Sequence, residues 1–129
     1  MTRWYLDASA ALKLTQREPE SAALIRKIDD EQPTFVGCWL LVTEMRRAVH
    51  RNNVLTQARV TDFLDNVDLH ELPHHVFVEA GLLPGAHLRS LDALHLAAAI
   101  QIGADAIVTY DTRMAQAARG VGVKVLAPA

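Results

Sequence analysis

The segment LRSLDALHLAAAIQIGADAIVTYD, residues 88–111, decides the fold of this chain. Its middle is apolar almost all the way round, interrupted only by His95 and Gln101, and a helix with this pattern is a buried helix. Ser90 is expected to cap the start of the helix, and Gly103 is expected to end it. The helix is therefore predicted to lie against the core of the protein.

Two acidic residues flank the buried elements of this segment. Asp92 lies in the first turn of the predicted helix, and Asp111 follows the short apolar run Ala106–Val108, which predicts a buried strand. A buried charge is costly unless it is paired or bound to a metal. Both acids are therefore expected to face a partner.

The first strand of the fold is expected close to the N-terminus. Trp4–Leu6 is short and apolar, ends at Asp7, and precedes a helix-like run over residues 8–14. This succession is typical of a parallel sheet, in which ligands bind at the carboxyl ends of the strands. Asp7 is either a functional residue at that edge or an acid that only complements the dipole of the following helix.

Short apolar runs and helical patterns alternate along the chain, so we predict a parallel sheet of about five strands flanked by helices. Helix 39–52 and a helix capped by Thr56 should form a hairpin, whose apolar surface either packs on the core or serves a partner. Other strands are expected at 34–36, 67–72, 106–108 and 121–126. Other helices are expected at 76–83 and 112–118, and a further helix is expected to begin at Glu18–Glu20.

Composition limits the classes of protein to which the chain can belong. It has 129 residues, 50% of them hydrophobic, which suits a single domain, residues 1–129, with a sizeable core. The formal net charge of -2 differs from the strongly basic balance of many nucleic-acid-binding domains, but a local basic rim is compatible with it.

Cys38 is the single cysteine, so we expect a structural thiol and a cytoplasmic location. Neither a membrane-spanning run nor a signal peptide is recognisable.

Glu44 lies at the edge of the apolar face of helix 39–52, and Arg47 and Arg51 follow on the same side. Two interpretations stay open. The residues form a surface Glu–Arg pair worth a few tenths of a kcal/mol, or Glu44 points inward and the arginines attract an anionic substrate. His95, in the buried helix, is expected to be a packed residue or a support for a metal ligand rather than a ligand itself.

Four acids have a structural interpretation individually, but together they favour a metal site. Neighbouring parallel strands bring the residues after them to one edge, and several carboxylates in one pocket repel each other unless a cation is present. An all-oxygen cluster suits Mg²⁺ or Mn²⁺, which can activate water toward a phosphodiester. The hydroxyls of Ser9 and Thr109 can orient the carboxylates or that water. The predicted catalytic and metal-binding acids are Asp7, Glu44, Asp92 and Asp111.

Two other classes of small α/β protein have acidic pockets. A phosphoacceptor receiver domain needs adjacent acids after its first strand and a lysine after its last one, whereas Asp7 has no acidic neighbour and Lys124 lies inside a predicted strand. A phosphatase with an aspartate nucleophile needs a second Asp two residues after the first, where this chain has Ser9. The pattern therefore favours neither class.

Four segments of the chain resemble the PIN domain, in particular the VapC-type toxins of bacterial toxin–antitoxin pairs. They are YLDASAALKL, LLVTEMRRAV, RSLDALHLAAA and AIVTYDTRMAQAARGVGVKVLAP, and they follow the order of the family over essentially the whole chain. The resemblance implies a PIN-like three-layer α/β/α sandwich. It also implies an acidic metal site at Asp7, Glu44, Asp92 and Asp111, with Thr109 as the hydroxyl residue beside the last acid.

The same resemblance implies an activity and partners. The protein would be an endoribonuclease toxin that uses Mg²⁺ or Mn²⁺ to cut structured RNA, such as tRNA or rRNA, and thereby inhibits translation. It would form a homodimer and be neutralised by a VapB-type antitoxin that threads a segment into the acidic pocket. The alternative is a catalytically silent PIN fold that binds and regulates through its partner. The arginines expected to guide the RNA backbone are Arg46, Arg47, Arg51, Arg89 and Arg113.

Overall fold

The computed structural model describes residues 1–129 and contains one sheet with the strand order β3-β2-β1-β4-β5. All four pairs of neighbouring strands are parallel, which confirms the predicted sheet. The strands are β1 (Arg3–Leu6), β2 (Thr34–Cys38), β3 (Val67–His70), β4 (Ala106–Val108) and β5 (Val125–Leu126). The helices are α1 (Ala8–Thr15), α2 (Ser21–Glu31), α3 (Trp39–Val49), α4 (Gln57–Leu64), α5 (His74–Leu82), α6 (Ser90–Ile102) and α7 (Thr112–Gly120).

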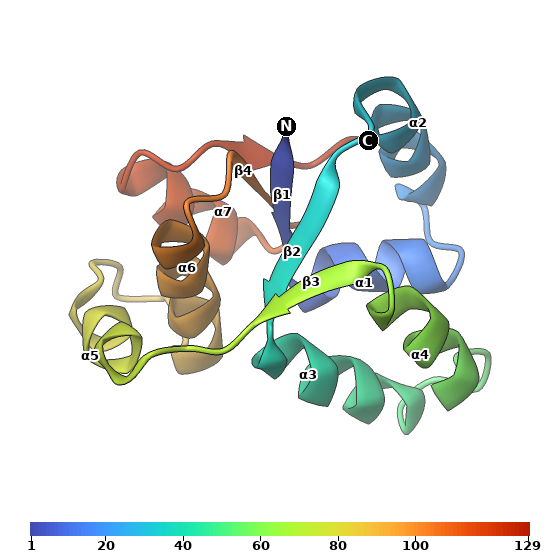
Figure 1. The fold of residues 1–129 in the computed structure, drawn as a ribbon, viewed down its shortest axis with the longest axis horizontal. Coiled ribbons are helices and arrows are strands. Elements are labelled where there is room, and N and C mark those ends of the chain that lie inside the picture. The colour runs from blue at the N-terminus through green and yellow to red at the C-terminus, as the bar shows by residue number, and fades with distance from the viewer.

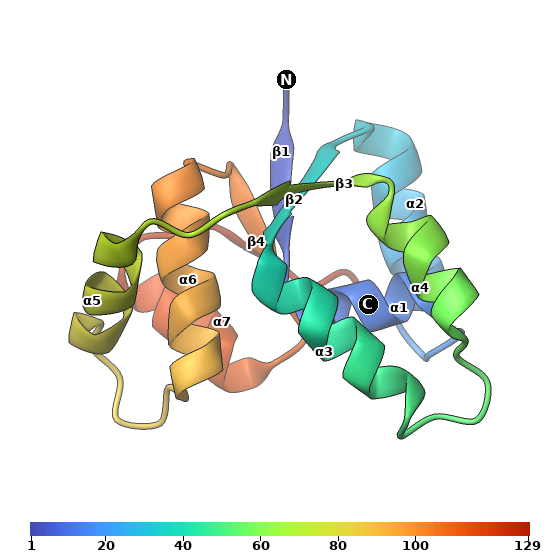
Figure 2. The same cartoon turned by 60° about the horizontal axis from the view of Figure 1, so that its bottom comes forward.

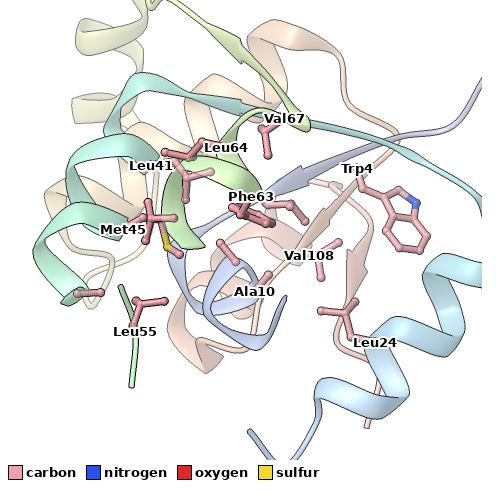
Figure 3. Close-up of a cluster of buried hydrophobic side chains, with 14 of the residues drawn as sticks. Trp4, Ala10, Leu24, Leu41, Met45, Leu55, Phe63, Leu64, Val67 and Val108 are labelled. Carbon is pink, nitrogen blue, oxygen red and sulfur yellow. The ribbon is translucent and has the colours of Figure 1, made fainter. Parts of the chain in front are cut away.

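Helices cover both faces of the sheet (Figure 1). Side chains alternate across β1, so that Trp4 and Leu6 pack with α1–α4 whereas Tyr5 packs with α6 and α7. Figure 2 shows the same division, with α5–α7 on one side of the strands and α1–α4 on the other. The largest hydrophobic cluster lies on the α1–α4 side (Figure 3). The molecule is the predicted three-layer sandwich, and none of its helices combines the length and apolarity needed to cross a membrane.

The register of the sheet determines where the site residues leave it. β1 is the middle strand, and its last residue, Leu6, is paired with Val108 at the end of β4. Asp7 and Thr109 therefore leave the sheet side by side. Cys38 ends β2 on the other flank of β1 and leads directly into α3. Three chain segments thus meet at one carboxyl edge, where open parallel sheets bind their ligands.

Some element boundaries differ from the prediction. α2 begins at Ser21 because the preceding residues form a turn, closed by hydrogen bonds from Ser21 N to Glu18 O (3.0 Å) and from Glu18 N to Ser21 Oγ (2.9 Å). The N-cap of α6 is Arg89, so Ser90 is the first helical residue and not the cap. α3, β3 and β5 are shorter than expected, because turns and irregular segments take up the remaining residues.

The α3–α4 hairpin forms as predicted, and its apolar surface packs on the core. Thr56 caps α4, its Oγ1 accepting a hydrogen bond from Arg59 N at 3.1 Å. Val60, Phe63 and Leu64 of α4 are buried in the main cluster together with the inner face of α3. The hairpin therefore fixes the direction of α3, which carries Glu44.

Gly103 ends α6 with a left-handed backbone, at a φ of 73°. A Cβ at this position would have its nearest neighbour at 3.8 Å, so space is available and the cost of a side chain lies in the backbone. We expect Gly103→Ala to lower the free energy of unfolding by about 1 kcal/mol. Urea denaturation followed by circular dichroism measures this difference.

Gly81→Ala is the matched control for this substitution. Gly81 lies inside α5 with ordinary helical dihedrals, and no atom lies within 4 Å of the Cβ position. Alanine is the better helix former by about 1 kcal/mol, so this variant should be as stable as the wild type or more stable. Equal destabilisation by the two variants would contradict the assignment of the cost to the left-handed backbone.

Candidate active site

Asp7 lies at the carboxyl end of the middle strand and is the N-cap of α1. Its Oδ1 accepts hydrogen bonds from Ala10 N (3.0 Å) and Ser9 Oγ (2.6 Å), and its Oδ2 accepts one from Thr109. The residue is only 4% exposed. This position at a helix start fits the structural interpretation of Asp7. It does not exclude a role at the sheet edge, because the same carboxylate stands where the strand ends.

Both predicted hydroxyl residues support Asp7, although they come from different segments. Ser9 Oγ accepts a hydrogen bond from Tyr110 N (2.8 Å) and lies 3.4 Å from Thr109 Oγ1. The Thr109 hydroxyl donates to Asp7 and accepts from Asp111 N at 3.1 Å. Thr109 is therefore a direct link between the first and the last acid of the site.

Asp111 and Asp92 stand at the beginnings of two further helices. Asp111 is the N-cap of α7, and its Oδ1 accepts from Arg113 N (2.9 Å) and Met114 N (3.2 Å). Asp92 lies in the first turn of α6, and both acids are partly exposed. The free N–H groups at a helix start stabilise negative charge. Helix starts therefore stabilise the charge of three of the four predicted acids, and backbone hydrogen bonds hold two of them, Asp7 and Asp111, in place.

The four acids influence one another electrostatically. Burial raises the pKa of Asp92, and the negative charges of Asp111 and Asp7 raise it further. Glu44 acts in the same direction, whereas His95 opposes it. Burial also raises the pKa of Asp7, although its hydrogen bonds act against this increase. The structure thus brings the four carboxylates into one electrostatic neighbourhood, as the sequence predicts.

Glu44 points from α3 to His95 of α6, with its Oε1 hydrogen-bonded to Nε2. The Glu44 side chain is 24% exposed and that of His95 is 1% exposed. Neither Arg47 nor Arg51 pairs with Glu44, so the interpretation as a surface Glu–Arg pair is wrong. Burial lowers the pKa of His95, but hydrogen bonds with Cys38 and Glu44 outweigh burial and raise it to about 10.

Tyr5 is not among the residues predicted from the sequence, yet it supports His95. Its hydroxyl lies 2.6 Å from His95 Nδ1 and 3.2 Å from Cys38 Sγ. The available signal is the alternation along β1, which places Tyr5 on the face covered by α6. A buried tyrosine needs a polar partner for its hydroxyl. Cys38 is buried, as expected for a structural thiol.

The chemistry of the four side chains fits a hard divalent cation, because they offer only carboxylate oxygens. The chain alone does not form a closed metal site, since no three potential ligands meet in a ligating arrangement. Burial is the main cause of the raised pKa of Asp92, and the repulsion from Asp111 and Asp7 that adds to it is what a cation would relieve. The residues therefore fit a site whose carboxylates close around the ion when it binds.

The five arginines predicted to contact RNA differ in whether their guanidinium groups already have a hydrogen-bond partner in the protein. Arg46 is committed to the α3–α4 hairpin, since its guanidinium donates to the backbone O (3.2 Å) and side-chain O (3.1 Å) of Gln57. The other four are exposed and have neither a side-chain hydrogen bond nor an ion pair within the protein. They are Arg47 on α3, Arg51 in the turn after α3, Arg89 at the start of α6, and Arg113 at the start of α7.

Comparison with known proteins adds to this geometry. A family model described as PIN domain matches residues 4–120. The chain belongs to the PIN-domain family. Ribonuclease VapC46 of Mycobacterium tuberculosis is 39% identical over 130 residues, which cover 99% of each chain. Ribonuclease VapC35 of the same species is 35% identical over 129 residues, 96% of each chain. These relatives place the chain in the VapC branch of the PIN domains, which are nucleases.

Solved structures share the PIN fold of this chain. VapBC2 from Rickettsia felis, bound to a DNA fragment from its promoter, matches with a TM-score of 0.76 at 13% identity, over 97% of this chain and 98% of that one. Mycobacterium tuberculosis VapC20, described as a sarcin-ricin loop cleaving toxin, matches with a TM-score of 0.74 at 13% identity, over 97% and 99%. The predicted PIN-like sandwich is confirmed.

The raised pKa of Asp92 predicts how stability depends on pH. A carboxyl with a higher pKa in the folded state favours folding below its unfolded pKa of about 3.9, and this contribution is lost as the pH rises through the folded pKa. At pH 7, near-isosteric Asp92→Asn should therefore raise the free energy of unfolding, on the order of 0.5 kcal/mol. The gain should shrink toward pH 4, as measured by denaturation in EDTA. A variant less stable than the wild type at pH 7 would contradict the repulsion among the acids.

Proposed function

We propose that residues 1–129 form a single PIN domain that acts as an endoribonuclease toxin with Mg²⁺ as cofactor and Mn²⁺ as a substitute. Its substrate is a structured RNA, tRNA or rRNA, whose cleavage inhibits translation. The observation that carries this proposal is the proximity of the four acids, since the charges of Asp111, Asp7 and Glu44 add to the effect of burial in raising the pKa of Asp92. The similarity to Ribonuclease VapC46 and Ribonuclease VapC35 supports the class of reaction.

The proposed ligands of the cation are Asp7, Glu44, Asp92 and Asp111. The chemistry that bound Mg²⁺ supplies is activation of a water molecule and stabilisation of negative charge on the scissile phosphate. Asp7 is the fixed member of the set, because protein donors occupy both of its oxygens and hold its orientation. Asp92 is partly exposed, so it can adjust to the ion and the phosphate, whereas backbone hydrogen bonds to Oδ1 orient Asp111.

Two of the free arginines would hold the RNA backbone beside these acids. Arg113 is two residues after Asp111 and Arg89 is three residues before Asp92, each at the start of the helix that carries the acid. Contacts to phosphates position a nucleic acid without reading its sequence. Arg89 and Arg113 would thus offset the negative charge of the site toward an anionic substrate.

A toxin of this kind needs an inhibitor, and we propose a VapB-type antitoxin that docks in the acidic pocket. The solved structures that share the fold include the toxin–antitoxin assembly VapBC2 from Rickettsia felis and VapBC-1 from nontypeable Haemophilus influenzae. We also propose a homodimer in the cytoplasm. Exposed apolar side chains such as Phe77, Val78 and Leu82 of α5 are compatible with further protein contacts.

RNA cleavage tests the proposed function. The purified chain, freed of antitoxin, should cut total bacterial tRNA or rRNA into discrete fragments in Mg²⁺ or Mn²⁺, and excess EDTA should abolish the cleavage. Asp92→Asn and Asp7→Ala should each lower the rate by about 100-fold or more, because charge stabilisation by the metal is worth several kcal/mol. Fragment yield on sequencing gels measures the rate.

Asp62→Asn is the matched control for charge removal. Asp62 is exposed on α4, away from the sheet edge, and forms no ion pair, so this variant should cleave like the wild type. Full activity of Asp92→Asn would refute the site. A folded wild type that cuts no RNA under any metal condition would favour the catalytically silent, partner-binding alternative.

The salt dependence of RNA binding tests the arginines separately from the cleavage reaction. In the Asp92→Asn background, Arg113→Gln should weaken binding to tRNA and reduce the slope of log K against log salt by about 0.7 to 0.9, the range for one lost phosphate contact on single-stranded and duplex nucleic acid. Arg46→Gln should change the slope much less, because its guanidinium is bound to Gln57. Equal slopes for Arg113→Gln and its parent would exclude a phosphate contact by Arg113.

A further inference from the structure

A buried polar network lies behind the acid site and connects α3, α6, β1 and the end of β2. Glu44 Oε1 is hydrogen-bonded to His95 Nε2, and His95 Nδ1 lies 2.6 Å from the Tyr5 hydroxyl. That hydroxyl lies 3.2 Å from Cys38 Sγ, which is 3.9 Å from His95 Nδ1. Both nitrogens of the imidazole therefore have partners, and these partners set the orientation of the ring.

His95 is too deeply buried to contact RNA. It is 1% exposed, and both Tyr5 and Cys38 are 0% exposed. The rings of Tyr5 and His95 pack edge to face, with centroids 5.6 Å apart and an interplanar angle of 69°. Glu44, with its side chain 24% exposed, is the one member of the network that reaches the surface. Any effect of the network on the site therefore passes through the Glu44 carboxylate.

Glu44 differs from the other three acids in how it is held. Asp7, Asp92 and Asp111 stand at helix starts, where backbone N–H groups favour their charge. Glu44 lies inside α3 on a longer and more flexible side chain, and its hydrogen bond with His95 is the only one that orders the carboxylate. Because His95 takes Oε1, the second oxygen remains available to a cation.

We propose that His95 is a positioning residue that holds the Glu44 carboxylate in the metal site, and that Tyr5 holds the imidazole in turn. This inference rests on the proposed function, because it assigns Glu44 to that site. Hydrogen-bond partners behind metal ligands fix the geometry of the ligand, and their loss typically weakens metal binding by about 10- to 100-fold.

Mn²⁺ binding to the purified full-length chain tests the proposal without any need for catalysis. The free Mn²⁺ signal in electron paramagnetic resonance gives the affinity. His95→Ala should weaken Mn²⁺ binding by about 10- to 100-fold, and His95→Gln should recover much of the loss because its amide N–H can reach Glu44. Tyr5→Phe keeps the ring and removes the hydroxyl, so it should weaken binding less than His95→Ala does.

A double-mutant cycle separates positioning from general damage to the fold. If His95 acts through Glu44, then adding His95→Gln or His95→Ala to Glu44→Gln should cause no further loss of Mn²⁺ affinity. Val76→Ala is the matched control, since Val76 is fully buried in a hydrophobic cluster between α5 and α6 and has no part in the polar network. This control should lower the melting temperature and leave Mn²⁺ affinity unchanged.

The outcomes distinguish the two proposals. Loss of affinity in Glu44→Gln together with wild-type affinity in His95→Ala would overturn the positioning role and leave the metal site intact. Additive losses in the double mutant would also overturn it. Unchanged Mn²⁺ binding in Glu44→Gln, or no binding by the wild type, would overturn the proposed metal site itself and the positioning role with it.

Discussion

The structure depends on a buried carboxylate at the end of its middle strand. Asp7 is almost inaccessible to water, and burial raises its pKa, so the fold must supply donors to keep it there. These donors are the N–H of Ala10 and the hydroxyls of Ser9 and Thr109. Thr109 can contribute only because β4 lies beside β1 in parallel register. The hydrogen bonds that the buried Asp7 carboxylate needs thus depend on the start of α1, on the end of β4 and on the strand order that places β4 beside β1.

The site uses two different physical means to hold its acids. Asp7, Asp92 and Asp111 stand at helix starts, so the main chain itself stabilises their charges. Glu44 has no helix start and relies on the side chain of His95 from another helix. The core behind the site is therefore partly polar. The apolar contacts of α3 position the helix, and the rings of His95 and Tyr5 position the Glu44 carboxylate that the helix carries.

Local patterns predict most of the fold and part of the site. The apolar runs identify β1, β2 and β4, and Gly103 identifies the end of α6, because these signals reside in neighbouring residues. Convergence of Asp7 and Asp111 is predictable because parallel strands end at one edge. The partner of Glu44 is not, since His95 is 51 residues away along the chain, whereas helix periodicity points only to nearby arginines. Tyr5 is missed for the same reason, as its hydroxyl is satisfied by residues of two other elements.

The path of the chain between Asp92 and Asp111 has a consequence for variation in length. α6 has 13 residues and carries the chain roughly 20 Å away from the acid edge, and the turn at Gly103 with β4 brings it back to the same edge. α6 leads away from the acid edge and β4 leads back to it, so Asp92 and Asp111 lie near the same edge. A residue inserted or deleted inside α6 would rotate Asp92 by about 100° relative to the buried face of the helix, whereas pairing with β1 fixes the end of β4 that leads to Asp111.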